Sequence, residues 1–305
     1  MRHPRCSTGW RPPAPARGAW HPRSRTQTVA LIPARTLSAT ATAGELWARE
    51  QLTLLLRARF APRAVGTFLL ESQRRTNRER RARPATARRM RRWVGAGAGA
   101  WAALALAGQE PFRRRIGAFA AWWALVWLML DWHIGMVETE DGRDRNLGPA
   151  DACTLARVWL VPAAADTPMP WMCALAFISD GLDGRLARMS EPTRIGRDLE
   201  GLADAAFAAA ALRGALRQDW LSRAAGIGEL VRLGIGFGYA LYVYFGSASA
   251  PDPRVIHAAR VTTPVRAGGL VMAGLRRRRA ADALVLGGAG WSALAIGRAL
   301  IKRAP

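Results

Sequence analysis

The amino-acid sequence predicts an all-α fold, a bundle of helices that crosses a membrane several times. Half of the 305 residues are hydrophobic. Residues 116–137 hold one charged side chain, Asp131, in 22 positions, which is long enough for a helix to cross a hydrocarbon core of about 30 Å. Taken singly, the shorter apolar runs are equally typical of buried helices in soluble proteins, but their close succession favours a polytopic membrane protein. The apolar runs cover residues 93–108, 116–137, 152–165, 168–179, 202–212, 224–248, 262–275 and 281–299.

Most of the positive charge lies before the first apolar run. The chain carries a formal charge of +23, and residues 1–92 hold 21 arginines against 4 acidic residues, a net charge of +17. Such a segment is attracted to anionic lipid or to nucleic acid, although a solvated, arginine-rich tail has the same composition. No RNA-binding motif with interleaved aromatic residues and no zinc-ligand spacing supports nucleic-acid binding, so we expect no nucleic-acid partner.

We expect residues 1–92 to form a basic, largely disordered extension. Its beginning is rich in proline, arginine, serine and threonine without a sustained period. Residues 45–71 have a helix-like amphipathic pattern that Pro62 should interrupt. An alternative is that the native chain starts at Met90, so that the residues before it are not part of the protein.

Residues 93–137 predict an additional transmembrane hairpin of two helices. The break lies at residues 108–115, where the sequence GQEPFRRR separates the two apolar runs. Glycines at positions 95, 97 and 99 suit close packing of helices in lipid.

Four carboxylates lie close together in the sequence, at Asp180, Asp183, Glu200 and Asp204. The i, i+3 and i, i+4 spacings put each pair on one face of a helix. If the two helices are antiparallel neighbours joined by residues 185–197, the pairs face each other and repel one another unless cations lie between them. An all-oxygen ligand set suits Mg²⁺, Mn²⁺ or Ca²⁺, and two such ions can bridge a pyrophosphate. The alternative is a charged loop whose acids pair with arginines at a membrane surface.

The residues around the carboxylates carry a family signature. Gly184 and Gly196 let a backbone or a ligand come close, and Arg188 offers a planar donor to a phosphate. Residues 180–204 read D-x2-D-G-x2-A-R-x7-G-x3-E-x3-D, which resembles the signature of the CDP-alcohol phosphatidyltransferase family, D-x2-D-G-x2-A-R-x8-G-x3-D-x3-D. The matching residues are Asp180, Asp183, Gly184, Ala187, Arg188, Gly196 and Asp204.

Weaker similarity extends the resemblance over residues 146–300, and two departures interrupt it. The weaker matches are Asn146-Leu147, Thr154-x2-Arg157-x4-Pro162 and Pro264-Val265-Arg266. Glu200 stands where the family has its third aspartate, and the interval before Gly196 is one residue shorter. Glutamate keeps the charge but carries it one methylene farther from the backbone.

The resemblance implies that residues 146–305 form a membrane domain with the six transmembrane helices of that family, preceded here by the hairpin. The family moves a phosphatidyl group from a CDP-alcohol such as CDP-diacylglycerol to an acceptor hydroxyl, releasing CMP, in phospholipid biosynthesis. It implies two divalent cations, Mg²⁺ or Mn²⁺, contact with membrane lipids, and a homodimer in the cell membrane. Four arginines in the 185–197 loop place the active site on the cytoplasmic side.

The resemblance also assigns roles to residues by their position in the signature. Asp204 is implied as the catalytic general base. The implied metal ligands are Asp180, Asp183, Glu200 and Asp204. The implied substrate-binding residues are Gly184, Ala187, Arg188, Gly196, Thr154 and Arg157.

Two other interpretations stay open at this point. A membrane protein that binds or moves divalent cations explains the acids, but not the Gly184-x2-Ala187-Arg188 motif. A catalytically impaired relative, in which Glu200 marks lost activity, explains both. The acceptor is open among glycerol phosphate, inositol or its phosphate, serine and another phospholipid. Arg157 and Arg266 are candidates for holding an anionic acceptor, or they set the topology.

Overall fold

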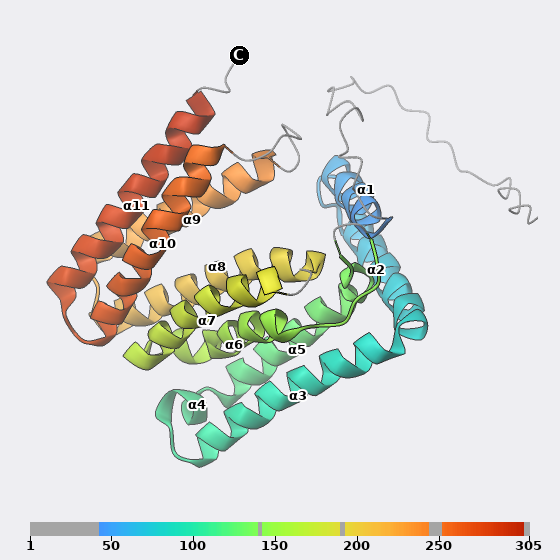
Figure 1. Cartoon of the computed structure of the whole chain (residues 1–305), viewed down its shortest axis with the longest axis horizontal. Helices are drawn as coiled ribbons and strands as arrows, with labels where there is room; N and C mark the ends of the chain where they lie inside the picture. Colours follow the sequence, from blue (N-terminus) through green and yellow to red (C-terminus); the bar gives the residue numbers. More distant parts are fainter. Residues whose placement is uncertain (1–42, 140–141, 190–192, 244–251, 302–305) are drawn as a thin grey trace, which may run out of the picture. The chain divides into compact units, whose positions relative to one another are not determined.

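The described chain is helical almost throughout. The computed structural model describes residues 43–139, 142–189, 193–243 and 252–301. In these ranges it contains eleven α-helices, the 3-10 turn η1 (Ile134–Met136) and no β-strand. The predicted all-α class is therefore confirmed (Figure 1). The helices are α1 (Ala43–Arg57), α2 (Pro62–Ala82), α3 (Pro84–Leu106), α4 (Glu110–Arg114), α5 (Ile116–Trp132), α6 (Pro149–Ala164), α7 (Pro170–Met189), α8 (Arg194–Arg217), α9 (Arg223–Leu241), α10 (Pro253–Gly274) and α11 (Arg278–Ile301).

The carboxylates lie among the helices from α6 to α11. Helix α6 packs against both α7 and α8, while α11 packs against α9 and α10. Helix α10 also contacts α7 and α8, which joins the two groups. The larger hydrophobic core is formed by buried side chains of α3 to α8, and a second one by side chains of α8 to α11. Helix α8 contributes to the larger core along much of its length, whereas α7 contributes through its first turns, with Met172, Cys173 and Ala176.

Tryptophans join the α3–α5 segment to α6. Trp122 Nε1 donates to the backbone carbonyl of Val158 at 2.9 Å, and Trp101 Nε1 donates to that of Trp159 at 3.2 Å. Pro162 lies inside α6 and has no N–H to donate to the Val158 carbonyl. The Trp122 indole therefore satisfies a backbone acceptor that the proline would otherwise leave without its helical partner.

One of the three glycines in α3 lies at a close helix approach. A Cβ at Gly97 would collide with the rings of Trp123 and Trp159, whereas one at Gly95 or Gly99 would have open space around it. Because a helix repeats every 3.6 residues, positions i and i+4 share a face and position i+2 lies opposite. Close packing is therefore seen at Gly97, while Gly95 and Gly99 lie on the opposite face of α3.

The N-terminal region is helical over the stretch 45–71, with the expected break before Pro62, and helices continue from there to residue 92, where disorder was expected. Residues 43–92 form α1, α2 and the first turns of α3, while residues 1–42 lie outside the described residues. Pro62 separates α1 from α2 and is the first residue of the second helix, a position that suits proline because the missing N–H has no helical partner there. These helices also make specific contacts. Arg80 of α2 forms an ion pair with Asp131, and such a pair holds a basic helix against the bundle.

The second helix of the predicted transmembrane hairpin is shorter than expected. Helix α5 ends at Trp132, and its 17 residues span about 26 Å. The expected run continued to Val137, but the chain turns through η1 instead, just after the ion-paired Asp131. Among the described helices, α11 is long and apolar enough to cross a membrane, and α5 is a shorter apolar helix.

Candidate functional site

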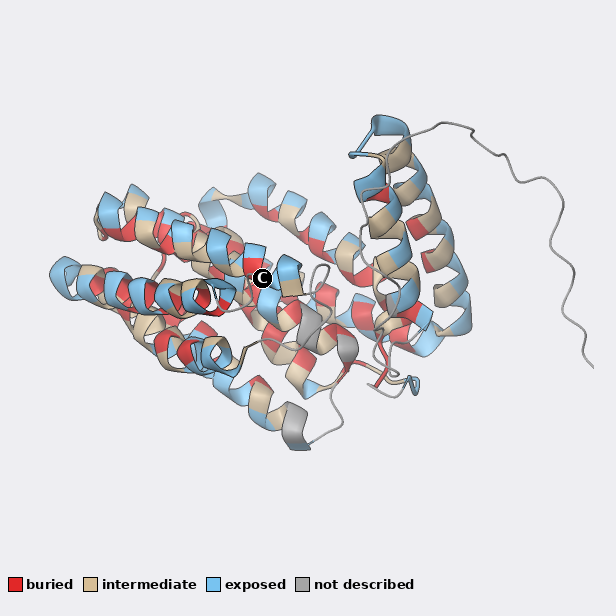
Figure 2. Ribbon diagram, turned by 90° about the horizontal axis from the view of Figure 1, so that it is seen from above, coloured by how far each residue is buried: buried red, intermediate tan, exposed pale blue. Residues whose placement is uncertain are grey.

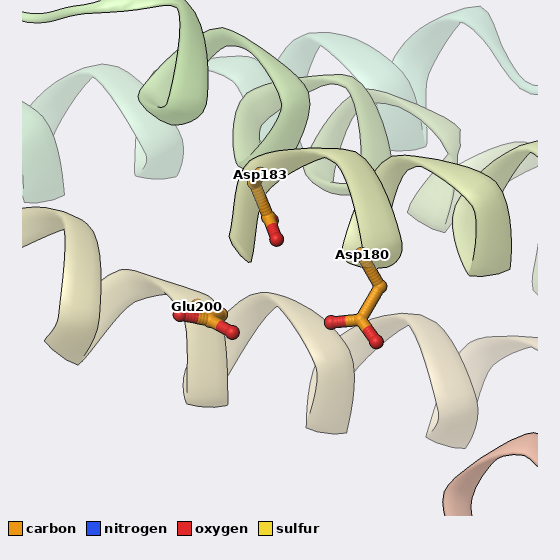
Figure 3. Close-up of side chains that lie close together, drawn as sticks. All are labelled: Asp180, Asp183 and Glu200. Atoms are coloured by element: carbon orange, nitrogen blue, oxygen red, sulfur yellow. The ribbon is translucent and has the colours of Figure 1, made fainter. Parts of the chain in front are cut away.

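Three of the predicted carboxylates come together between α7 and α8. Asp180 and Asp183 lie on α7, and Glu200 lies on α8. One carboxylate oxygen of each lies within 4.8 Å of the other two. Figure 3 shows the three side chains in the space between the two helices. Acids from two helices therefore form one cluster, as predicted, and both helices pack against α6.

Asp183 is the buried member of this cluster, with 3% of its surface exposed. Its Oδ2 accepts hydrogen bonds from Arg157 Nη2 at 2.6 Å and from Thr154 Oγ1 at 3.2 Å. Its Oδ1 is buried and has no hydrogen-bond partner among the described residues. An unpartnered buried carboxylate oxygen is costly, so this atom is suited to receive a cation.

Arg157 of α6 holds the carboxylates of both helices. It is 2% exposed, and besides Asp183 it forms an ion pair with Asp204, whose Oδ1 lies 2.8 Å from Nε. Its Nη2 also lies 3.9 Å from Asp180 Oδ1. One guanidinium compensates one of the four negative charges of the cluster and Asp204. The remaining three are the electrostatic reason to expect bound cations.

A second set of contacts joins the first turns of α6 and α8. Asp151 accepts a hydrogen bond from the Gly148 backbone N–H at 2.7 Å and another from Thr193 Oγ1 at 3.1 Å. Thr193 in turn accepts from the Gly196 backbone N–H at 3.0 Å and caps α8. A Cβ at Gly196 would lie 2.7 Å from Asp151 Oδ1. The close neighbour of Gly196 in the structure is therefore the Asp151–Thr193 pair that caps α8. The substrate-binding role of Gly196 stays a prediction.

The other signature residues lie on α7. Gly184 directly follows Asp183 and is partly buried. The backbones of Ala187 and Arg188 belong to α7, but their side chains lie outside the described ones, so their predicted contacts with substrate stay predictions. Helices α7 and α8 extend well into the stretch 185–197, which makes the connection shorter than the loop we expected.

A cavity of about 380 Å³ lies beside the carboxylates and is bounded by α6 to α11. Arg157, Asp180 and Asp204 line one part of it. Apolar side chains, including Phe177 and Leu270, line much of the rest. A cavity with an apolar wall and a few polar groups is typical of a site for an amphipathic ligand.

Three further charged residues line this cavity. Their contact with one another was not predicted from the sequence. Glu229 Oε1 accepts from Arg232 Nε at 3.0 Å and from Arg266 Nη1 at 2.7 Å. Glu229 Oε2 and Arg266 Nε are buried without a hydrogen-bond partner in the described ranges. A Cβ at Gly288 would lie 2.5 Å from Arg266 Cγ, so this glycine makes room for the arginine. Two charges inside the apolar run 224–248 were the available signal, because ionisable groups in such runs mark functional sites.

Comparison with known families agrees with this geometry. Residues 149–273 match the family model described as CDP-alcohol phosphatidyltransferase. This segment belongs to the CDP-alcohol phosphatidyltransferase family. No curated protein and no solved structure matched the chain. The match contains the whole signature and ends before α11, within the range predicted from the resemblance.

The family match indicates the general chemistry of the site. It indicates a transferase of substituted phosphate groups that moves a phosphatidyl group from a CDP-alcohol and uses divalent cations. The cluster of Asp180, Asp183 and Glu200 provides oxygen ligands for such ions. A helical bundle of this family also suggests a membrane protein.

Proposed function

We propose that this chain transfers the phosphatidyl group of CDP-diacylglycerol to the hydroxyl of a water-soluble, anionic acceptor, releasing CMP, as a step of phospholipid biosynthesis. One observation carries the proposal. Carboxylates from two helices converge, with a buried and unpartnered Asp183 oxygen, beside a cavity with an apolar wall. The converging acids suit cations, and the cavity suits a substrate that has both a diphosphate and lipid tails.

The proposed location is the cell membrane, with the carboxylates near its cytoplasmic face. Large apolar side chains are exposed along the outer faces of the helices, among them Ile178, Phe237 and Leu294 (Figure 2). Large exposed apolar side chains on several helices support contact with lipid. The stretch 185–197 contains four arginines whereas residues 166–170, at the other end of α7, contain no basic residue, and this asymmetry supports the orientation.

The proposed cofactors are two divalent cations, Mg²⁺ or Mn²⁺. Their ligands would be Asp180, Asp183, Glu200 and Asp204, an all-oxygen set that fits hard ions. The lengthened side chain of Glu200 still brings an oxygen to the cluster. Bound there, the cations would neutralise the diphosphate and stabilise the charge that develops on the leaving CMP.

The chain's own residues position the groups and move one proton. The acceptor oxygen forms a bond to the phosphatidyl phosphorus, the bond from that phosphorus to the CMP oxygen breaks, and CMP leaves with the electron pair. Asp204, which lines the cavity, takes the proton of the acceptor hydroxyl as general base. Arg157 fixes Asp204 and Asp183 through its two ion pairs. Thr154, which donates to Asp183, would help Arg157 to hold this carboxylate in place.

Three signature residues would serve the nucleotide, and a fourth would hold two helices together. Gly184 and Ala187 would leave room for cytidine, Arg188 would bind its phosphate, and Gly196 would keep the start of α8 close to α6. Since nucleophile and leaving group need mainly positioning and charge neutralisation, these roles require no covalent intermediate.

The acceptor is proposed to be anionic because Arg232 and Arg266 line the same cavity. Glu229 compensates one of these two positive charges, so the group retains a net charge of +1. The Arg266 Nε–H has no partner among the described residues and is a donor available to an acceptor phosphate or carboxylate.

A CMP-release assay tests the proposal. Proteoliposomes would receive labelled CDP-diacylglycerol, Mg²⁺ or Mn²⁺, and in turn glycerol 3-phosphate, inositol 1-phosphate, inositol and serine. We expect cation-dependent CMP release with a phosphate-bearing acceptor and its loss in Asp204→Asn. Absence of CMP release with every acceptor would favour the catalytically impaired relative. Cation uptake into the vesicles without CMP release would favour a cation carrier.

A further inference from the structure

The α1–α2 hairpin lies across the end of the bundle where the carboxylates are. Figures 1 and 2 show the hairpin running crosswise to α3 and α6–α8 in both views. Its connection to the bundle is specific, because Arg80 pairs with Asp131 at the end of α5 and Trp132 Nε1 donates to Gln73 at 3.1 Å. Arg89, at the start of α3, donates to the Leu147 carbonyl just before α6. The hairpin therefore starts from the end of the bundle that holds the first turns of α6 and α8.

The inner half of the hairpin is packed, whereas its outer half buries Leu55 but leaves most of its large apolar side chains exposed. The Arg75 guanidinium lies 4.6 Å from the centroid of the Trp47 ring, and Ser72 and Thr76 are buried. The outer half, residues 54–70, instead exposes large apolar side chains to an extent of 43–61%. They are Leu54, Leu56, Phe60, Leu69 and Leu70.

Arginines accompany these apolar side chains. Arg57, Arg59 and Arg63 are exposed and form no ion pair within the described part of the chain. The turn between α1 and α2 has an unusual backbone. Its exposed residues Arg59 and Phe60 have φ values of +49° and +56°. Left-handed conformations at successive non-glycine residues are uncommon, and they occur preferentially at functional sites.

We propose that the outer half of the α1–α2 hairpin docks on an anionic lipid surface, on the side of the membrane where the carboxylates lie. If the bundle helices cross the membrane, a hairpin that runs crosswise to them lies in the membrane plane. Exposed leucines and a phenylalanine enter the boundary between headgroups and acyl chains, while the arginines bind anionic headgroups. The exposed apolar side chains favour lipid over nucleic acid. Arginines alone are sufficient to bind the phosphates of a nucleic acid, so a nucleic acid would leave the exposed leucines and Phe60 without a role.

The proposal goes beyond the transferase function and is tested without catalysis. Amide hydrogen exchange of the full chain would be measured in nanodiscs of phosphatidylcholine, with and without phosphatidylglycerol. Three arginines near an anionic surface strengthen its binding about a hundredfold at moderate salt. We expect amides of residues 54–70 to exchange at least about tenfold more slowly in the anionic discs, and high salt to reverse part of this effect.

Matched triple variants separate the hairpin from a general charge effect. Arg57→Gln, Arg59→Gln and Arg63→Gln together should reduce the difference between the two discs to less than about twofold. The control is Arg277→Gln, Arg278→Gln and Arg279→Gln, which removes three exposed arginines at the α10–α11 turn and should keep the full difference.

Three results would overturn the proposal. The first is equal exchange of the wild-type hairpin in both discs. The second is a loss of the difference in the α10–α11 control that equals the loss in the hairpin variant. The third is protection by added RNA in phosphatidylcholine discs that matches the protection by phosphatidylglycerol, which would assign the surface to nucleic acid.

Discussion

Asp183→Asn should weaken cation binding and abolish CMP release. The substitution keeps the size of a buried side chain and removes the charge that holds Arg157 Nη2 at 2.6 Å. It also replaces the unpartnered Oδ1, the atom that we assign to a cation. Two effects follow. The cation-free protein becomes less stable, and added cations raise its free energy of unfolding by less than in the wild type.

The first effect is limited because Arg157 keeps its pair with Asp204 at 2.8 Å. A buried hydrogen bond to a charged group contributes about 1.5–3 kcal/mol, so the free energy of unfolding without cations should fall by roughly 2 kcal/mol. The second effect follows from linkage. A cation at a hundred times its dissociation constant stabilises the wild type by about 2.7 kcal/mol, and a hundredfold weaker site lowers that to about 0.4 kcal/mol.

Asp166→Asn is the matched control. Asp166 lies just beyond the other end of α6, its side chain is 8% exposed, and it pairs with Arg115 at 2.8 Å. Its removal should cost a similar free energy of unfolding, because the broken contact is of the same kind. It should leave the cation response and CMP release unchanged, because no cluster carboxylate is altered.

The measurements are thermal unfolding in detergent with Mn²⁺ or with a chelator, and CMP release from CDP-diacylglycerol. A full cation response in Asp183→Asn would refute the assignment of this carboxylate as a ligand. An equal loss of response in Asp166→Asn would show that the response reports stability and not the cluster.

Further substitutions, each with its own comparison, test neighbouring parts of the site. Glu200→Asp should keep CMP release within about tenfold of wild type and Glu200→Gln should lose it, because charge at the cluster matters more than the extra methylene; a larger loss in the aspartate variant would show that this site is adapted to glutamate. Gly196→Ala should lower the free energy of unfolding by about 1–3 kcal/mol because its Cβ would collide with the Asp151–Thr193 cap, whereas Gly181→Ala, with open space around it, should be neutral or slightly stabilising; equal effects by thermal unfolding would contradict the close approach. Arg266→Gln should raise the KM of an anionic acceptor at least about tenfold without changing that of CDP-diacylglycerol; parallel changes in both values would indicate a structural role.

Local spacing predicted the two carboxylate pairs. The i, i+3 pair on α7 and the i, i+4 pair on α8 each follow from helix geometry alone. Their convergence required in addition that α7 and α8 both pack against α6, which brings the two pairs to the same side. The family signature added which acids belong together, and the family match over residues 149–273 bears out that resemblance.

Contacts between distant residues could not be predicted in the same way. Glu229 and Arg266 lie on different helices, 37 positions apart, and no local period connects them. The helical structure of residues 72–92 was missed for a related reason. Their arginine-rich composition indicated disorder, whereas Arg80 finds its partner Asp131 51 positions away, in an apolar helix.

The charge distribution along the cavity suggests how two anionic substrates are kept in order. The part near Asp180, Asp183, Glu200 and Asp204 is negative even after pairing with Arg157, so it accepts a diphosphate only together with cations. The group around Glu229, Arg232 and Arg266 retains a positive charge and accepts an anion without them. The proposed CDP-linked lipid would therefore bind near the carboxylates, and the proposed anionic acceptor near Arg232 and Arg266. Without cations, the carboxylate part would no longer bind the diphosphate. Chelation should consequently abolish binding of the CDP-linked lipid while leaving binding of the acceptor measurable by calorimetry, and loss of both together would show that the two groups act as one site.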